Sequence, residues 1–234
     1  MTASRVSLPE EFVNLQEAVP TLEISPRYAT PFNFTGRIVA GYQAAKVVLT
    51  RQAAEALGRV QEEALNRGFS LVVYDGYRPQ KAVMDFVRWF SEPDILDHQR
   101  VYYPFCAKAD LVSDGYISKT SSHTRGSTVD LTLKRLGTPL RLPQDWILRS
   151  LRLKDDRQIP VQEDGTLPMG GHFDLFDISS NGASCLLGED MQNNRKMLAG
   201  LMMDKGFESY EKEWWHFRFA REPFPHYGFD FDIL

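Results

Sequence analysis

Hydrophobic residues recur at helical spacing in three parts of the chain. They lie three or four positions apart within 50–68, 79–90 and 191–206, which places them on one face of a helix. Thr50 can serve as an N-cap, and glycines at the ends of the first and third stretches are typical of helix termini. The pattern predicts three amphipathic helices, with apolar stripes that include Ala53, Leu57, Val60, Ala64, Phe86, Trp89, Leu198 and Leu201.

Shorter apolar stretches have the pattern of strands. Residues 71–74 form a compact hydrophobic run, and residues 129–133 and 213–219 alternate between apolar and polar side chains, as strands with one buried face do. In the N-terminal part we expect at most two short strands, at 37–39 and 46–49. Helices and strands are interspersed without a regular βαβ rhythm, which favours an α+β fold over a doubly wound sheet.

The composition is that of an ordinary globular chain. Its 234 residues are 43% hydrophobic and 25% charged, which fits one large domain or two small ones. A net charge of −4 gives no electrostatic reason to expect nucleic acid or an anionic membrane as partner. No apolar run approaches the roughly 20 residues that span a bilayer. We therefore expect neither nucleic acid nor a membrane as a partner.

The N-terminal stretch and the cysteines bear on the cellular compartment. Residues 1–15 lack the apolar core of an export signal, so we expect a cytoplasmic protein. Cys106 and Cys185 do not make a disulfide framework in a chain of this length, and they are not spaced as metal ligands. We expect two reduced and mostly buried thiols.

Two polar residues that are costly to bury flank the strand predicted at 129–133. His123 precedes the strand and Asp130 lies at its start, in the segment SSHTRGSTVDLTL, and burial of either without a partner is unfavourable. Gly126 and Ser127 lie between them, so the gap is not a helix face. A loop that folds back on the strand could bring the two side chains together. Imidazole and carboxylate groups are both zinc ligands.

The C-terminal segment EWWH supplies a third candidate ligand. His216 with His123 and Asp130 would give three protein ligands and an open position, which is the arrangement of catalytic zinc sites. Glu213 could act as the base, but it shares a face with His216 only if it lies at a bend before the strand. From spacing alone, the same residues also fit a hydrogen-bonded core pair and two ordinary polar strand residues.

These residues and five longer segments resemble a known enzyme family. The segments are RYATPFNFTGRIVAGY, VVYDGYRPQKAV, ISKTSSHTRGSTVDLTL, FDLFD and GFESYEKEWWHF. The pattern SxHxxGxxxD followed by EWWH is similar to the zinc signature of the VanX-type D-alanyl-D-alanine dipeptidases. That family is related to bacterial D,D-carboxypeptidases and shares its core fold with the hedgehog domain. The resemblance implies a single α+β domain over 1–234, with a central, mainly antiparallel sheet flanked by helices.

Eight positions match functional residues of that family. Three match the ligands of one zinc ion: His123, Asp130 and His216. Two match the general base and the arginine that stabilises the oxyanion: Glu213 and Arg78. Three match the groups that hold the free ammonium of the substrate: Ser121, Asp174 and Tyr28. The implied activity is hydrolysis of the small dipeptide D-alanyl-D-alanine to two D-alanines by zinc-activated water.

The chain departs from the family pattern in three places, one of which is Thr128, where the family commonly has alanine. The segment 137–168 is longer than the family usually has, and we expect a passive insertion there because loops tolerate added length. After Asp174 the family often carries a Glu-Arg pair, whereas this chain reads DISS, which leaves the support of that loop open. We expect His172, close to this loop, to be a solvated loop histidine.

Two other functions share parts of this signature. A D,D-carboxypeptidase would act on longer peptidoglycan stem peptides, and a non-catalytic, zinc-stabilised binding module would need only the three ligands. Glu213 and Arg78 argue against the binding module, because a structural zinc site needs neither a base nor an oxyanion partner. The sequence leaves open whether the role is antibiotic resistance, wall recycling or nutrition. It also leaves open the oligomeric state, a homo-oligomer included.

Overall fold

The computed structural model describes residues 8–113 and 115–234, so residues 1–7 of the stretch used for the export prediction lie outside the described residues. The helices are α1 (Leu15–Ala18), α2 (Arg51–Asn66), α3 (Gln80–Phe90), α4 (Leu96–Tyr102) and α5 (Glu189–Met203). The strands are β1 (Phe12–Asn14), β2 (Glu23–Ile24), β3 (Val48–Thr50), β4 (Phe69–Asp75), β5 (Thr128–Arg135), β6 (Ile147–Arg152), β7 (Gln158–Glu163), β8 (Phe207–Tyr210) and β9 (Glu213–Phe219). Within this described part, no helix is long and apolar enough to cross a membrane.

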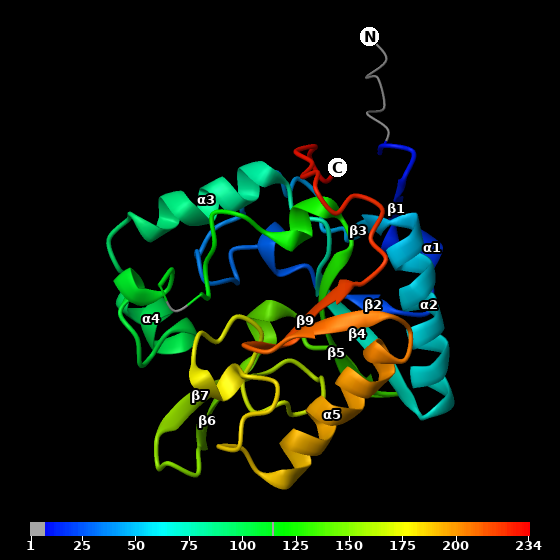
Figure 1. The fold of residues 1–234 in the computed structure, drawn as a ribbon. Coiled ribbons are helices and arrows are strands. Elements are labelled where there is room, and N and C mark those ends of the chain that lie inside the picture. The colour runs from blue at the N-terminus through cyan, green and yellow to red at the C-terminus, as the bar shows by residue number, and fades with distance from the viewer. Residues whose placement is uncertain (1–7, 114) are drawn as a thin grey trace.

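A five-stranded sheet forms the centre of the molecule (Figure 1). Its strand order is β2-β4-β5-β9-β8. β2 runs parallel to β4, whereas the pairs β4–β5, β5–β9 and β9–β8 are antiparallel. β1 pairs with β3, and β6 pairs with β7, in two further two-stranded sheets. The prediction of an α+β fold with a mainly antiparallel sheet and flanking helices is therefore confirmed.

Two helices cover one face of the central sheet. α2 packs on β4, α5 packs on β8 and β9, and the two helices contact each other. The apolar stripe predicted for α2 lies in this contact, because Ala53, Leu57, Val60 and Ala64 are fully buried. Burial of a side chain such as Leu57 contributes about 1.5–3 kcal/mol, so the hydrophobic stripe determines how this helix lies on the sheet.

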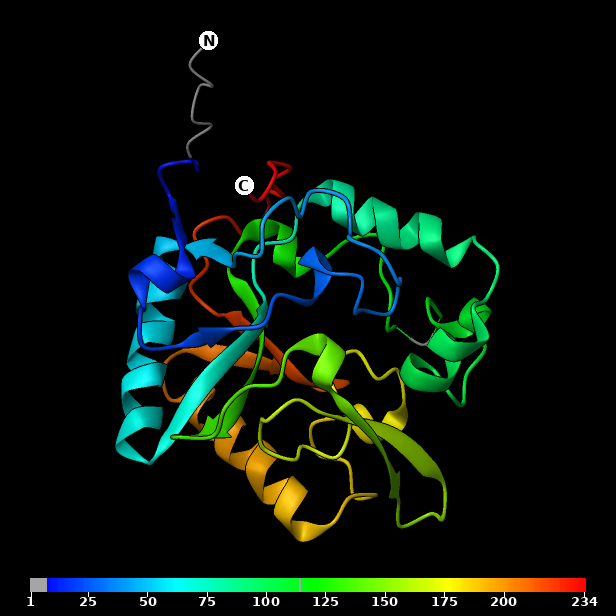
Figure 2. The same cartoon turned by 180° about the vertical axis from the view of Figure 1, so that it is seen from behind.

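Aromatic side chains from irregular segments and from α3 pack on the opposite side of the sheet. The course of α3 and of the strands can be followed in Figures 1 and 2. Phe86 of α3 contacts Tyr28, Tyr28 contacts Phe173, and Phe173 contacts Tyr74 of β4. Distant parts of the chain thus meet on the side of the sheet that carries Asp130. The polar residues predicted to be functional lie among these contacts.

Several elements differ from the sequence predictions. Residues 37–39 form no strand, and the N-terminal part has three short strands, β1, β2 and β3, where at most two were expected. Residues 207–210 form β8, which the pattern did not indicate. Phe207 is buried but the other three residues of β8 are exposed, so the strand lacks an alternating signal. The segment 137–168 contains the hairpin of β6 and β7. Its assignment as an insertion in a single domain stays a prediction.

Two polar side chains lie in other environments than expected. Thr50 stands at the N-cap position of α2, but its hydroxyl lies 2.7 Å from the hydroxyl of Ser127 and does not cap the helix. This buried contact ties the start of α2 to the segment before β5. Cys185 is exposed and Cys106 is half-buried, so the prediction of two mostly buried thiols was wrong for Cys185.

Candidate metal centre and active site

Two of the three candidate ligands come from neighbouring strands. Asp130 of β5 lies directly opposite His216 of β9 in the antiparallel register. Side chains of directly opposed residues point to the same face of a sheet and are close in space. Consequently the Asp130 Oδ1 and His216 Nδ1 atoms are 3.1 Å apart.

The third candidate ligand comes from a tight turn before β5. His123 lies in a 3₁₀ turn, Ser122–Arg125, and the Ser121 hydroxyl accepts a hydrogen bond from the backbone N–H of His123. Gly126 ends the turn with a φ of 75°, a left-handed conformation that glycine adopts without penalty. The turn folds His123 back over the strand, so that its Nε2 atom lies 3.2 Å from Asp130 Oδ2.

The three side chains offer donor atoms suited to one metal ion. One ligand atom from each of His123, Asp130 and His216 lies within 4.8 Å of the others, and His123 Nε2 is 3.3 Å from His216 Nδ1. Ligands at zinc–nitrogen bond length around a tetrahedral ion are separated by about 3.3 Å. The residues therefore fit a metal ion with the size and ligand preference of zinc.

The tautomer of His123 is fixed by its other ring nitrogen. His123 Nδ1 lies 2.7 Å from the carbonyl oxygen of Gly76, so it donates its proton there and leaves the Nε2 lone pair free for a metal. Such outer hydrogen bonds are usual for metal-bound histidines. Burial lowers the pKa of His123, which favours the neutral imidazole that binds metal ions.

Glu213 reaches the same site because the edge of the sheet is irregular. Ser209 of β8 pairs with Phe217, whereas the next residue, Tyr210, pairs with Glu213. The extra residues of β9 form a bulge, which re-aims side chains. Glu213 Oε2 lies 3.4 Å from His216 Nδ1. The bulge thus supplies the bend that Glu213 needs in order to share a site with His216. Burial raises the pKa of Glu213 to about 7, although the nearby His216 acts in the opposite direction.

Arg78 lies beside the metal-ligand cluster and is held there by Asp75. Its Nε donates to Asp75 Oδ2 at 2.9 Å, and a terminal nitrogen lies 3.4 Å from Asp130 Oδ2. A register shift between Val73 and Asp75 interrupts the pairing of β4 with β5 and aims the Asp75 carboxylate into the site. The Tyr42 hydroxyl donates to the same carboxylate at 2.7 Å.

Sequence reasoning missed Asp75. This carboxylate connects Arg78, Tyr42 and the turn of His123, since Asp75 Oδ2 lies 3.7 Å from His123 Nδ1. The available signal was an aspartate at the end of a buried strand, three residues before a candidate catalytic arginine. Charged residues at such positions are seldom buried without a partner.

Asp174 and Tyr28 form a buried pair on the other side of the site. The Tyr28 hydroxyl donates to Asp174 Oδ2 at 2.9 Å, and both residues are buried. Burial and the charge of Asp130 raise the pKa of the Asp174 carboxyl well above its usual range. A cation placed beside Asp174 would therefore favour its charged form.

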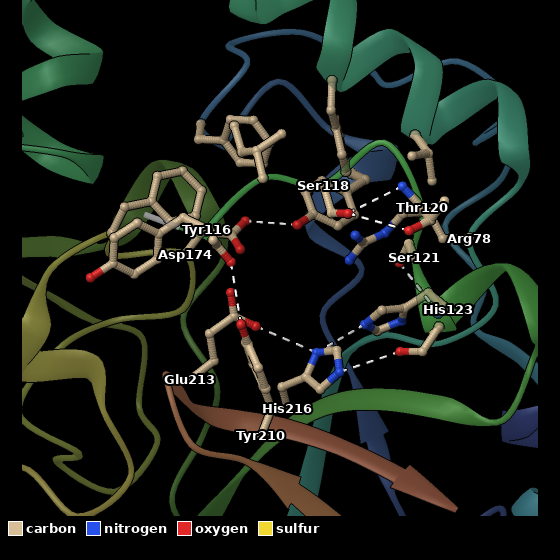
Figure 3. A pocket seen from close by; sticks show the side chains of 18 residues that line it. Arg78, Tyr116, Ser118, Thr120, Ser121, His123, Asp174, Tyr210, Glu213 and His216 are labelled. Atoms are coloured by element: carbon tan, nitrogen blue, oxygen red, sulfur yellow. Dashed lines mark hydrogen bonds and ion pairs between the residues drawn. The ribbon is translucent and has the colours of Figure 1, made fainter. Parts of the chain in front are cut away.

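Apart from Asp130, the predicted residues line one cavity of about 270 Å³. Figure 3 shows His123, His216 and Glu213 directed toward one another, with Asp174 and Arg78 on opposite sides. Ser121 and Tyr28 also line this cavity, and its apolar wall includes Val83, Phe86, Ile117 and Phe176. The arrangement combines a metal-ligand cluster, a carboxylate base, a cationic group and a separate buried carboxylate.

His172 lies outside this cavity and was predicted wrongly. It is only 6% exposed, and its Nδ1 lies 3.2 Å from the carbonyl oxygen of Pro160. It lines a second cavity of about 620 Å³ beside the β6–β7 hairpin. The hairpin covers this histidine, so it is not solvated, and burial lowers its pKa to about 4.

Comparison of the sequence with known proteins identifies the family of this chain. Residues 9–142 and 156–233 match the peptidase family described as D-Ala-D-Ala dipeptidase. Residues 143–155, which include the whole of β6, are left out of the match. The match otherwise includes every residue of the site.

Three similar proteins carry the same description. A D-alanyl-D-alanine dipeptidase of Enterococcus faecium is 37% identical over 227 residues, which cover 95% of this chain and 98% of the relative. One of Streptomyces coelicolor is 37% identical with the same two coverages. One of Escherichia coli is 29% identical and covers 88% of this chain and 83% of the relative.

Among solved structures, a zinc-bound vancomycin-resistance D,D-pentapeptidase, VanY, aligns with a TM-score of 0.40 and 12% identity. The alignment covers 81% of this chain and 84% of that chain. This likeness is too distant to carry an argument.

The family match extends over most of the chain. The three relatives align with the chain over 98%, 98% and 83% of their own lengths. The chain therefore belongs to the D-Ala-D-Ala dipeptidase family of metallopeptidases.

Proposed function

We propose that this protein is a zinc-dependent dipeptidase that hydrolyses D-alanyl-D-alanine to two D-alanines. The observation that carries the proposal is the convergence of His123, Asp130 and His216, with Glu213 Oε2 3.4 Å from His216. The family match supplies the substrate, because its description names D-Ala-D-Ala. The proposal needs one zinc ion per chain.

His123 Nε2, His216 Nδ1 and an Asp130 carboxylate oxygen would hold the ion. When bound, zinc supplies Lewis acidity, which makes water more acidic and polarises a carbonyl group. The neutral imidazole of His123, fixed by Gly76, and the buried carboxylate of Asp130 suit this role. Two neutral imidazoles and one carboxylate leave the site cationic after binding, which favours a developing negative charge.

Glu213 and Arg78 would carry the proton transfer and the charge stabilisation. Glu213 takes a proton from the attacking water and later delivers it to the leaving amine of the cleaved dipeptide. The Arg78 guanidinium lies next to Asp130, where it can stabilise the oxyanion that forms from the peptide carbonyl. Asp75 holds the guanidinium in place, so little reorganisation is needed during the reaction.

Asp174, Tyr28 and Ser121 would bind the free ammonium of the substrate. The raised pKa of Asp174 supports this role, because burial and Asp130 disfavour its charged form and the ammonium of a bound substrate would favour it. A blocked or extended N-terminus would leave Asp174 unpaired in a buried position, which is costly. The pocket would thus restrict the enzyme to dipeptides.

The alternatives are a D,D-carboxypeptidase and a non-catalytic zinc module. A carboxypeptidase must admit a chain that extends past the ammonium position, but Asp174 and Tyr28 are 5% and 2% exposed. A zinc module has no use for a carboxylate base beside the ligands. The buried Asp174 and the half-buried Glu213 next to His216 therefore favour the dipeptidase.

An amine-release assay tests the proposal. Wild-type protein should release amine from D-Ala-D-Ala, a chelator should abolish the activity, and zinc should restore it. Glu213→Gln should lower kcat by roughly 10²–10⁴. Glu211→Gln is the matched control, since Glu211 is an exposed carboxylate two residues away, and it should keep wild-type kcat.

Two further substrates separate the alternatives. N-acetyl-D-Ala-D-Ala and a stem pentapeptide ending in D-Ala-D-Ala should be hydrolysed far more slowly than the free dipeptide. Faster hydrolysis of the pentapeptide would identify a carboxypeptidase. Zinc binding without hydrolysis of any of the three would identify a binding module and overturn the proposal.

A further inference from the structure

The loop that carries Asp174 needs support from outside itself. Asp174 has a φ of 63°, and a non-glycine residue in this left-handed region is uncommon. Such a conformation persists only where the surroundings hold it. The Tyr28 hydroxyl contacts the tip of the side chain, and the backbone N–H groups of Leu175 and Phe176 donate to the carbonyl oxygens of His172 and Tyr102. These contacts hold the middle of the loop, so the position of the carboxylate also depends on the contacts that close its two ends.

Arg195 of α5 closes this loop at both ends. Its Nε donates to the carbonyl oxygen of Met169 at 2.6 Å, and its Nη1 donates to those of Ser179 and Asn181 at 2.8 Å each. Met169 precedes Asp174, whereas Ser179 and Asn181 follow it. One buried guanidinium, 3% exposed, thus joins the two ends of the segment that presents Asp174.

The same guanidinium contacts the neighbour of the candidate base. The central carbon of the Arg195 guanidinium lies 5.7 Å from the ring centroid of Trp214, which directly follows Glu213. Burial lowers the pKa of Arg195 to about 9, so the group is still charged at neutral pH. Its hydrogen bonds go to three separate carbonyl oxygens. Such a set of acceptors matches the several fixed N–H donors of a guanidinium better than the single ammonium group of lysine.

We infer that Arg195 is a positioning residue of the dipeptidase: it sets the Asp174 loop so that the carboxylate meets the ammonium of the substrate. The inference rests on the proposed function, in which Asp174 binds that ammonium. Arg195 lies on α5, on the helix-covered face of the sheet, and acts through the loop backbone. It therefore affects substrate binding without contacting the substrate.

A merely structural role makes a different prediction. If Arg195 only stabilises the fold, its replacement lowers the melting temperature, and the protein that remains folded binds substrate normally. If Arg195 positions Asp174, the folded and zinc-loaded variant binds the dipeptide weakly, because the carboxylate is displaced. The step catalysed after binding depends on Glu213 and Arg78 and should change less.

The test uses Arg195→Met and Arg195→Lys, with Lys196→Met as matched control. Lys196 is the exposed neighbour on the same helix, so its variant removes one positive charge without touching the loop. Zinc content, melting temperature, kcat and KM for D-Ala-D-Ala are measured well below the melting temperature of each variant. The Ki of propionyl-D-alanine, which lacks the ammonium, is measured in the same assays.

For Arg195→Met, KM should rise roughly tenfold or more while kcat changes less than about threefold. Arg195→Lys should show a smaller rise in KM, because one ammonium can satisfy only part of the three bonds. The Ki of propionyl-D-alanine should stay near its wild-type value in both variants, and Lys196→Met should match the wild type throughout.

Four outcomes would overturn the inference. An unchanged KM in zinc-loaded Arg195→Met would assign the residue to stability alone, and so would failure of both Arg195 variants to fold. An equal loss for the dipeptide and for propionyl-D-alanine would show a general distortion of the site. If the wild type itself releases no amine from D-Ala-D-Ala, the proposed function fails first and this inference falls with it.

Discussion

At the scale of single residues, the site has more carboxylates than cationic side chains until a metal ion and a substrate bind. Asp130 faces two imidazoles, Asp174 is buried and accepts a hydrogen bond from the Tyr28 hydroxyl, and Arg78 is shared between Asp75 and Asp130. A metal ion and a substrate ammonium would supply the missing positive charges. The buried charged groups that would carry the proposed chemistry are thus the same groups that would destabilise the fold if their charges stayed uncompensated.

Substitution of Arg78 tests the role of this positive charge directly. Replacement by Met removes the cation beside Asp130 and should lower kcat for D-Ala-D-Ala by roughly 10²–10³, because the loss of one oxyanion donor typically has this effect. Steady-state kinetics with zinc-saturated protein measure it. Arg88→Met is the control, since Arg88 is exposed on α3, and near-normal turnover of the Arg78 variant would remove Arg78 from the mechanism.

His172 gives a prediction on stability and pH. Its pKa is about 4 in the folded protein and near 6.5 in an unfolded chain. Below pH 6.5 the unfolded chain takes up the proton and the folded protein does not, so stability falls between about pH 6.5 and 4, by up to roughly 3 kcal/mol.

His172→Gln should lose this component, so that its urea unfolding free energy falls less steeply with acid than that of the wild type. All other titrating groups are common to the two proteins, which makes the difference specific to His172. Equal pH dependence of wild type and variant would mean that this imidazole is not shielded from protons in the folded state.

At the scale of elements, irregularities in regular structure place the site. Gly126 ends the turn that carries His123, a register shift in β4 aims Asp75, and a bulge between β8 and β9 brings Glu213 to His216. Each irregularity occurs next to a residue with a proposed role. The regular parts of the sheet serve to hold these three places at fixed distances.

Of these three positions, Gly126 is expected to tolerate substitution least. A Cβ atom there would lie 2.2 Å from the Phe12 ring, and a left-handed φ costs a non-glycine residue about 1–2 kcal/mol. Gly126→Ala should therefore lower the free energy of unfolding by at least that amount, measured by urea denaturation.

Gly200→Ala is the control for this substitution. Gly200 lies in α5, and a Cβ atom added there would have nothing within 4 Å, while alanine favours a helix by about 1 kcal/mol. This variant should be unchanged or more stable. Equal effects of the two substitutions would argue against a special conformation at Gly126.

The same elements explain what the sequence could predict. The helical stripe of α2 and the alternation of β5 follow from burial of one face, which leaves a periodic pattern. The ligands His123, Asp130 and His216 were identified by a resemblance, and the cross-strand register of Asp130 and His216 gives the physical reason that they meet. Bulges, the exposed edge strand β8 and the loop contacts of Arg195 depend on long-range pairing, which leaves no local pattern.

At the scale of the whole molecule, the site joins distant parts of the chain. Its residues come from the N-terminal segment of Tyr28, from β4, β5 and β9, and from the loop of Asp174. A ligand that binds only the assembled arrangement stabilises the entire fold. Metal binding and global stability should therefore be coupled.

Chelation should lower the melting temperature of the wild type. At a free zinc concentration about 1,000 times Kd, binding contributes about 4 kcal/mol, which corresponds to roughly 10 °C for a chain of this size. Differential scanning calorimetry measures the shift with and without chelator. His216→Gln should show little zinc-dependent shift, and an equal shift in that variant would mean that zinc stabilises the protein from another place.

Anomalous diffraction at the zinc edge tests the central claim most directly. Crystals of the zinc-loaded wild type should show one strong peak per chain, about 2.0–2.2 Å from His123 Nε2, His216 Nδ1 and an Asp130 carboxylate oxygen. A peak held by other residues, or no peak within bonding distance of these three atoms, would contradict the account.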